Sequence, residues 1–338
     1  MLYSLARNLL FQLDAERAHE LTIESFKHFP KLATAPFVSR VVSDPVQLMG
    51  LKFPNRVGLA AGLDKNGECI EAWARLGFGF IEVGTVTPRP QPGNPKPRMF
   101  RLPQDQAIIN RLGFNNKGVD YLLRQVACAD YKGILGINIG KNFDTPIERA
   151  AEDYLHCLRK VYAKASYVTV NISSPNTKNL RDLQDEERLN DLLRQLMRAR
   201  AELAQQNGRK VPLLVKIAPD VSEEQIVHIA RAAREFGLDG LIATNTTITR
   251  PGLQDERVAN ETGGLSGAPL KPLAESTLRR LRAKVGADFA LIGVGGICDG
   301  DDALQRRQAG ADLIQIYTGF IYRGPGLIGE CVQALSKT

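Results

Sequence analysis

The sequence has few cysteines and histidines, and neither residue type is spaced as a metal site or a disulfide framework requires. Five cysteines are spread over 338 residues without a C-x-x-C pair, and the four histidines are equally scattered. Disulfide-stapled folds and zinc-binding modules are therefore excluded as classes, and we expect no bound metal. Unpaired cysteines are typical of a reducing compartment, which favours the cytoplasm.

Long hydrophobic runs are also missing. No apolar stretch reaches the roughly 18 to 20 residues that a membrane-spanning helix requires. The first residues lack the basic start, the apolar centre and the cleavage site of a signal peptide. We therefore expect a protein on the cytoplasmic side of the cell membrane that touches this membrane peripherally.

Positive charge is in excess but is not concentrated. The net charge is +7, yet no dense run of lysine and arginine stands out. Such a run is what a nucleic-acid-binding surface requires, so we expect no nucleic-acid partner. Scattered basic residues fit an anionic substrate or an anionic lipid surface better.

What the sequence does contain is a repeated alternation of short apolar runs and longer helical patterns. Each run is continuously apolar rather than alternating, which is typical of parallel strands buried on both faces. The eight runs are residues 56–63, 79–86, 133–139, 167–172, 212–217, 240–244, 290–294 and 312–316.

A helical pattern follows each of these runs. In residues 146–163 apolar side chains recur on one face and charges cover the other, and Ser222 with two following acids predicts a helix start. Eight such units predict an α/β fold, the (β/α)8 TIM barrel, whose closed sheet needs this number. An open, doubly wound sheet is the alternative.

The N-terminal segment lies outside this alternation. We expect residues 1–40 to form a small extension and residues 41–338 the catalytic barrel. Residues 1–29 predict two amphipathic helices, the second capped by Asp14, and residues 46–57 predict a hairpin that closes the barrel floor. The helix pair either packs on the barrel like any other helix or faces a membrane.

Polar residues and glycines follow the predicted strands. The active site of a barrel lies at the carboxyl ends of its strands, so these residues are expected to meet in one mouth. Asparagines, with both donors and acceptors, suit a planar heterocycle with carbonyl and N–H edges. The glycines at 293–296 and 262–267 favour a phosphate-bearing cofactor.

Several long motifs in this order strongly resemble the dihydroorotate dehydrogenase family. The resemblance covers nearly the whole chain, including the N-terminal helices. The motifs are Gly58–Lys65 (GLAAGLDK), Gly84–Pro88 (GTVTP), Pro92–Pro95 (PGNP), Asn110–Asn115 (NRLGFN), Asn171–Thr177 (NISSPNT), Lys216–Pro219 (KIAP), Ala243–Thr247 (ATNTT) and Gly263–Gly267 (GGLSG).

The resemblance implies an FMN-dependent enzyme of pyrimidine biosynthesis that oxidises dihydroorotate to orotate. It implies the quinone-linked class in particular, because Ser174 stands where the soluble classes carry cysteine and because that class has the N-terminal helix pair. Ser174 is the expected catalytic base. Since a serine needs a relay for its proton, a water or Thr177 is expected nearby, enclosed by Phe114.

The same resemblance assigns the binding residues. Lys216 is expected at the pyrimidine edge of the flavin, Lys65 at both flavin and substrate carboxylate, and Arg101 near the quinone entrance. The expected FMN contacts are Ala61, Gly62, Leu63, Asp64, Lys65, Thr85, Asn138, Asn171, Lys216, Thr244, Gly267, Gly296, Tyr317 and Thr318. The expected substrate contacts are Lys65, Asn110, Arg111, Leu112, Gly113, Phe114, Asn171, Asn176, Asn245 and Thr246.

The expected partners are dihydroorotate and orotate, a membrane quinone of the ubiquinone type and the membrane surface, and we expect a monomer. Three alternatives remain open at this point. The electron acceptor could be fumarate or NAD; the barrel could be a Schiff-base aldolase that uses Lys216 or Lys65; or it could be a silent interaction module on a membrane.

Overall fold

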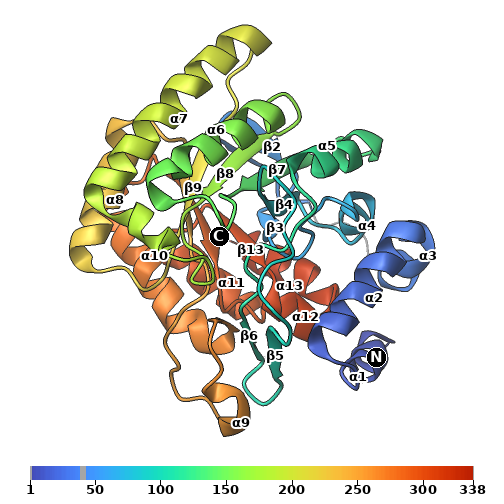
Figure 1. The fold of residues 1–338 in the computed structure, drawn as a ribbon. Helices are drawn as coiled ribbons and strands as arrows, with labels where there is room; N and C mark the ends of the chain where they lie inside the picture. The colour runs from blue at the N-terminus through green and yellow to red at the C-terminus, as the bar shows by residue number, and fades with distance from the viewer. Residues whose placement is uncertain (1, 39–42, 338) are drawn as a thin grey trace.

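The centre of the structure is a closed barrel of eight parallel strands (Figure 1). In the computed structural model, which describes residues 2–38 and 43–337, the strands follow one another around the barrel in sequence order, and the last pairs with the first. They are β3 (Val57–Leu59), β4 (Phe80–Val86), β7 (Ile134–Ile139), β8 (Tyr167–Asn171), β9 (Leu213–Ile217), β10 (Gly240–Ala243), β12 (Ala290–Val294) and β13 (Leu313–Ile316). The predicted (β/α)8 barrel is confirmed, and each of the eight apolar runs contributes one strand.

Helices surround the barrel because their apolar faces cover the outward side chains of the strands. They are α4 (Ile70–Arg75), α5 (Val119–Cys128), α6 (Ala150–Val161), α7 (Glu186–Asn207), α8 (Glu223–Glu235), α10 (Lys271–Val285), α11 (Gly300–Gln308), α12 (Thr318–Arg323) and α13 (Gly326–Leu335). Shorter helical segments are η2 (Ile147–Arg149), η3 (Leu180–Gln184), α9 (Glu256–Ala259) and η4 (Ala268–Leu270). The start predicted at Ser222 is confirmed, because Ser222 and Gln225 form a reciprocal capping box at α8.

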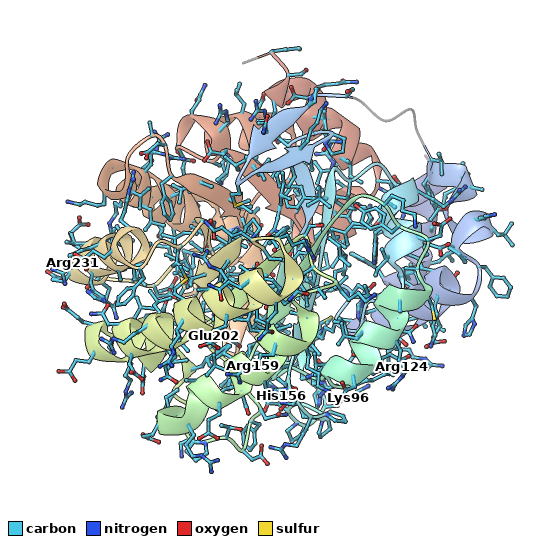
Figure 2. The ribbon with its side chains drawn as sticks, turned by 90° about the horizontal axis from the view of Figure 1, so that it is seen from above. Lys96, Arg124, His156, Arg159, Glu202 and Arg231 are labelled. Carbon is cyan, nitrogen blue, oxygen red and sulfur yellow. The ribbon has the colours of Figure 1, made fainter. Side chains whose placement is uncertain are left out.

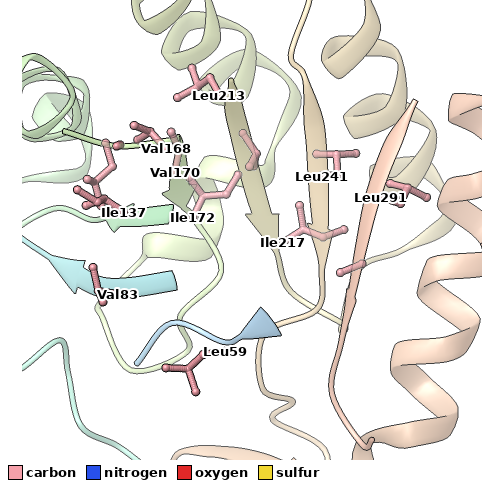
Figure 3. Close-up of a cluster of buried hydrophobic side chains, with 14 of the residues drawn as sticks. Leu59, Val83, Ile137, Val168, Val170, Ile172, Leu213, Ile217, Leu241 and Leu291 are labelled. Carbon is pink, nitrogen blue, oxygen red and sulfur yellow. The ribbon is translucent and has the colours of Figure 1, made fainter. Parts of the chain in front are cut away.

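The main apolar core lies between the strands and these helices. Figure 3 shows part of it, where Val83, Val168 and Leu241 point outward from three strands. Figure 2 shows the opposite side of the helices, where charged residues such as Glu202 of α7 and Arg231 of α8 project into solvent. This division is the amphipathic pattern that the sequence displays.

The bottom of the barrel interior is also apolar and is closed by a hairpin. Strands β1 (Val46–Leu48) and β2 (Leu51–Phe53) pair antiparallel, and the turn places Met49 and Gly50 at positive φ. The ring of Phe53 packs edge-on against Phe80 inside the barrel, with ring centroids 5.2 Å apart. The predicted hairpin is confirmed, and it fills the floor with aromatic and aliphatic side chains.

A small three-stranded antiparallel sheet beside the barrel mouth is absent from our sequence-based prediction. It consists of β5 (Met99–Leu102), β6 (Ala107–Asn110) and β11 (Gly264–Gly267). These strands are four residues each and mix polar with apolar residues, so they lack a clear periodic signal. The sheet matters because it joins two expected site residues, Asn110 and Gly267, on adjacent strands.

The N-terminal extension contains the two expected helices, α1 (Leu2–Leu10) and α2 (Ala15–His28), and Asp14 caps the second with its side chain. The chain then forms a further helix, α3 (Pro30–Thr34), and a 3-10 turn, η1 (Ala35–Phe37), where the sequence predicted only a linker. Pro30 occupies the first turn of α3, where its missing N–H is not needed. The extension lies at the side of the barrel, against α12 and β5 (Figure 1).

Candidate active site

A cavity of about 1070 Å³, measured with its open mouth, lies at the carboxyl ends of the barrel strands. Most of the residues that the sequence nominated line it together. These are Ser174, Ala61, Gly62, Lys65, Thr85, Asn110, Leu112, Gly113, Phe114, Asn171, Asn176, Lys216, Thr244, Asn245, Thr246, Gly267, Gly296, Tyr317 and Thr318. Strand ends from around the whole barrel therefore converge on one space.

Four nominated residues do not line this cavity. Asp64 is buried and accepts hydrogen bonds from the backbone of Glu68 and Cys69 and from Trp73, which makes it a loop anchor. Leu63 faces a different cavity, described below. Arg111 points outward to Glu261.

The fourth, Asn138, is fully buried directly behind Thr85, whose hydroxyl donates to the Asn138 carbonyl oxygen at 2.7 Å. Asn138 reaches the cavity only through this neighbour.

Ser174 lies on the loop that follows β8, and its side chain is almost fully buried at the cavity wall. Its hydroxyl oxygen accepts a hydrogen bond from the backbone N–H of Asn176 at 3.2 Å. Phe114, held at a positive φ of 55°, lines the same cavity. Thr177 is buried but is not part of the cavity wall, so it does not contact the same space as Ser174.

The asparagines of the site belong to a connected network. The Asn171 amide donates to the Thr85 hydroxyl at 2.9 Å, and its carbonyl accepts from the Ser173 hydroxyl at 2.9 Å. Asn245 donates to the same Ser173 hydroxyl at 2.9 Å. Further along the loop that follows β8, the Asn176 amide donates to the backbone carbonyl of Asn110 at 3.1 Å. Because each amide is fixed by another strand end, the cavity presents preoriented donors and acceptors.

Two lysines give the cavity a positive character. Lys65 donates to the backbone carbonyl of Gly62 at 2.8 Å, and burial lowers its pKa to about 8. Burial also lowers the pKa of Lys216, which makes no hydrogen bond or ion pair with any described side chain. Burying an ammonium without a partner costs free energy. The site therefore favours a ligand with a hydrogen-bond acceptor or a negative charge beside Lys216.

Glycines form one end of the cavity. Gly295 and Gly296 both have positive φ, and a Cβ on Gly296 would come within 2.4 Å of the Lys271 backbone. The buried guanidinium of Arg306 donates to the Gly295 carbonyl at 2.6 Å from behind. No side chain can stand at Gly296, which leaves backbone N–H groups as its polar atoms.

A second cavity of about 880 Å³ lies under the N-terminal helices. Its wall is mainly apolar and comes from α1, α2, the small sheet and α12, with Phe11, Phe26 and Trp73 among its aromatic residues. Arg101 lies over the Phe11 ring at 4.5 Å, as part of this wall. His19 also lines it, and its pKa is lowered to about 3 by burial and by the Lys65 charge.

The two cavities share part of their lining. Met99, Ile108 and Tyr317 belong to both walls, so a single layer of side chains separates the two spaces. At the outer side of the second cavity, the N-terminal helices expose Leu2, Leu5 and Leu9 to solvent.

Three polar residues near the site were not predicted from the sequence. Gln315 lines the cavity from β13, Ser266 lines it from β11 and contacts Thr318, and Glu82 lies inside the barrel on β4. A signal existed for two of them, because Gln315 and Glu82 interrupt otherwise apolar buried runs. A charged or amide side chain in such a strand is costly unless it is paired, and so indicates a special role.

Comparison with known proteins agrees with this geometry. The sequence profile of the dihydroorotate dehydrogenase family matches residues 45–338, which include the barrel and its entire mouth. The chain belongs to the dihydroorotate dehydrogenase family. As a member of this family, it is an oxidoreductase.

Relatives within the family are similar over their whole length. The chain is 59% identical over 334 residues to the dihydroorotate dehydrogenase (quinone) of Aromatoleum aromaticum, covering 99% of this chain and 95% of that one. It is 57% identical to the dihydroorotate dehydrogenase (quinone) of Thiobacillus denitrificans, covering 100% of both. A crystal structure of the Eimeria tenella DHODH with ferulenol superposes with a TM-score of 0.89 at 39% identity, covering 95% of this chain and 90% of that one.

Two further findings concern the described residues of this family member. None of the helices within residues 2–38 and 43–337 is both long and apolar enough to cross a membrane. The same part of the chain contains no cluster of three or more histidine, cysteine or acidic side chains that could hold a metal ion.

Proposed function

We propose that this protein oxidises dihydroorotate to orotate in the first cavity, with FMN as the bound cofactor, and passes the electrons to a membrane quinone in the second cavity, as a step of pyrimidine biosynthesis. The observation that carries the proposal is the shared wall. A polar cavity with a buried serine and two lysines adjoins an apolar cavity, and Met99, Ile108 and Tyr317 line both. Electrons can cross one layer of side chains, whereas the polar substrate and the lipophilic acceptor stay apart.

The residues present fit FMN. When bound, FMN supplies the ring that accepts a hydride. Its phosphate would lie at the glycine-lined end, where Gly296 excludes any side chain and Thr318 offers a hydroxyl. The unpartnered Lys216 would meet the polar edge of the ring. FAD, with a second phosphate and an adenosine, would have to extend beyond this end.

Ser174 would take the proton that dihydroorotate loses from the carbon next to the hydride-donating carbon. Lys65 would hold the substrate carboxylate, because at neutral pH an ammonium with a pKa of about 8 is charged. Asn110, Asn171, Asn176 and Asn245 would bind the carbonyl and N–H edges of the substrate ring. The burial of Ser174 supports this role, because water that competes for the proton is excluded.

We propose that residues 1–40 act as a membrane-facing extension and residues 41–338 as the catalytic barrel; the boundary between them lies outside the described residues. The exposed Leu2, Leu5 and Leu9 support peripheral attachment, because a membrane surface would bury them. The cytoplasmic side is proposed from the composition. We also propose that the protein acts as a monomer.

The test is an assay of the purified protein with dihydroorotate and different acceptors. We expect a yellow protein that releases FMN on denaturation and that reduces a ubiquinone-type acceptor but neither fumarate nor NAD. Well-folded protein that releases FAD or no flavin would contradict the cofactor, and turnover with fumarate or NAD would contradict the acceptor. A flavin that dihydroorotate cannot bleach would contradict the substrate.

A further inference from the structure

The layer of the barrel interior directly below the active-site cavity is polar, which is unusual for this fold. Barrel interiors are normally filled by branched apolar residues in successive layers. Here the lower layer follows that rule, with Phe80, Leu214 and Leu313 among its members. The next inward residues along β4 and β13 are Glu82 and Gln315, and both are completely buried.

Three groups surround the Glu82 carboxylate, and all three donate. The Asn138 amide donates to one oxygen at 2.8 Å, and the Tyr167 hydroxyl and the Gln315 amide donate to the other at 2.8 and 2.7 Å. A protonated carboxyl would need an acceptor, whereas an ionised carboxylate accepts only. The arrangement therefore fits an ionised Glu82, stabilised by hydrogen bonds at a depth where a bare charge would not persist.

This carboxylate fixes the orientation of the first amide above it. Because the Asn138 N–H groups face Glu82, the Asn138 carbonyl faces upward and accepts from the Thr85 hydroxyl at 2.7 Å. Thr85 has then used its only proton. Its oxygen must accept the next hydrogen bond rather than donate it.

The same logic continues to the cavity wall. The Thr85 oxygen accepts from the Asn171 amide at 2.9 Å, which leaves the Asn171 carbonyl to accept from the Ser173 hydroxyl at 2.9 Å. The Ser173 oxygen in turn accepts from Asn245 at 2.9 Å. The backbone N–H groups of Ser173 and Thr246 also donate to the carbonyls of Asn171 and Asn245, at 3.2 and 2.7 Å. The amides that line the cavity are therefore held in one direction from both ends of the chain, by backbone donors above and by the Glu82 carboxylate below.

Glu82 also balances a charge. Lys216 lines the cavity from β9, where it is almost fully buried. The negative charge that acts on it is that of Glu82, from the layer below. The interior therefore contains one buried anion and one buried cation that are not in contact.

We propose that Glu82 is a positioning residue for the reaction, which acts from beneath the site by anchoring the lower end of the Asn138–Thr85–Asn171 hydrogen-bond chain and by offsetting the charge of Lys216. The inference rests on the proposed function, because it concerns the bound FMN and the substrate. Glu82 itself touches neither of them.

The decisive variant is Glu82→Gln, which keeps the size of the side chain but removes its charge and its acceptor-only character. We expect the midpoint potential of the bound flavin to rise, since an uncompensated Lys216 favours the reduced ring. A tenfold change in the ratio of reduced to oxidised flavin corresponds to about 30 mV for two electrons. We also expect orotate affinity to fall on the order of tenfold, because a glutamine amide can donate toward Asn138 and so loosen the chain that holds Thr85 and Asn171 in place.

The matched control is Tyr167→Phe. It removes a hydrogen bond from the same carboxylate but leaves the charge and the bond to Asn138 in place. We expect a lower thermal midpoint with an unchanged flavin potential and orotate affinity. Both quantities are measured by dye equilibration and by titration of the flavin absorbance, without turnover.

The possible outcomes separate the two proposals. Glu82→Gln with wild-type potential and orotate affinity, or Tyr167→Phe with the same shifts as Glu82→Gln, would overturn the positioning role. If Glu82→Gln cannot be purified with flavin, the Glu82→Asp variant tests the role instead. Its carboxylate keeps the negative charge, so the flavin midpoint potential should stay at the wild-type value. Its shorter side chain reaches Asn138 less well, so orotate affinity should fall. An Asp variant with unchanged orotate affinity would also overturn the role. Wild-type protein that holds no FMN would instead overturn the proposed function.

Discussion

The two adjoining cavities are built on different principles. The first is made from strand ends, and its polar side chains hold one another through hydrogen bonds that begin inside the barrel. The second is made mainly from helices and from two strands of the small sheet, and its wall is mainly apolar. Proton and hydride transfer need groups fixed within fractions of an ångström, which rigid strands provide. A lipophilic acceptor needs an apolar passage of suitable shape, which packed helices supply.

The two regions nevertheless depend on each other through one buried ion pair. Glu16 of α2 accepts from Arg98, and both side chains are almost fully buried, with 7% and 8% of their surface exposed. Arg98 also donates to the backbone carbonyls of Pro92 and Asn94. Asn94 in turn donates to the carbonyl of Arg111 in the substrate loop at 2.8 Å. The N-terminal extension therefore stabilises the substrate loop in addition to lining the second cavity.

The largest expected effect is confined to the first cavity. Ser174→Ala should leave FMN content unchanged but slow flavin reduction by dihydroorotate about 10²–10⁴-fold, the usual contribution of a general base. Stopped-flow bleaching of the flavin measures this rate. Ser174→Cys should keep part of the rate because a thiol can also take the proton. Near-normal reduction by Ser174→Ala would assign the proton to another residue.

The next effect tests the dependence between the regions. Glu16→Gln leaves the Arg98 charge buried without its partner, which typically costs about 3–5 kcal/mol. We expect a lower thermal midpoint and a raised KM for both quinone and dihydroorotate. Glu20→Gln on the same helix is the control, since its pair with Lys96 is exposed and worth little. If Glu16→Gln raises only the quinone KM, the substrate loop does not depend on α2.

A smaller effect is expected from a change on α1, which should alter membrane binding and quinone turnover but not the first cavity. Leu9 is 74% exposed on α1, and burying a leucine contributes about 1.5–3 kcal/mol, so Leu9→Glu should weaken liposome binding at least about tenfold. Turnover with a long-tailed quinone should fall, while a small soluble dye should accept electrons as before. Phe143→Glu, at a residue 62% exposed on a barrel loop, is the control. Equal losses with dye and quinone would contradict a membrane role.

The smallest effect is a pH dependence of the first cavity. Burial lowers the pKa of Lys65 to about 8, so this group is charged at neutral pH and loses its proton as the pH rises through that value. We expect kcat/KM for dihydroorotate to be level below pH 7 and to fall several-fold between about pH 8 and pH 9. Lys65→Arg should abolish this alkaline fall, because a guanidinium stays charged. A fall that persists in Lys65→Arg would assign it to another group.

The hydrophobic pattern was sufficient to predict the barrel and the mouth. Continuous apolar runs separated by amphipathic helices admit few closed arrangements, and parallel strands place all their carboxyl ends on one side. Residues at the carboxyl ends of strands, such as Asn171, Lys216 and Asn245, could therefore be assigned to one site without knowledge of the packing. The small sheet escaped prediction because four-residue strands carry too little periodicity.

Only the tertiary structure decided which nominated side chains face the cavity and which stand behind it. Asn138 and Asp64 belong to carboxyl-end segments of the barrel as Asn171 does, yet Asn138 supports Thr85 from below and Asp64 anchors a loop. The apolar cavity draws its wall from residues as distant in sequence as Tyr3 and Pro325. Periodicity along the chain reports the face on which a residue lies, because it arises from local backbone geometry. Which partners meet across the barrel depends on its closure and on the docking of α2, and these long-range contacts leave no local signal in the sequence.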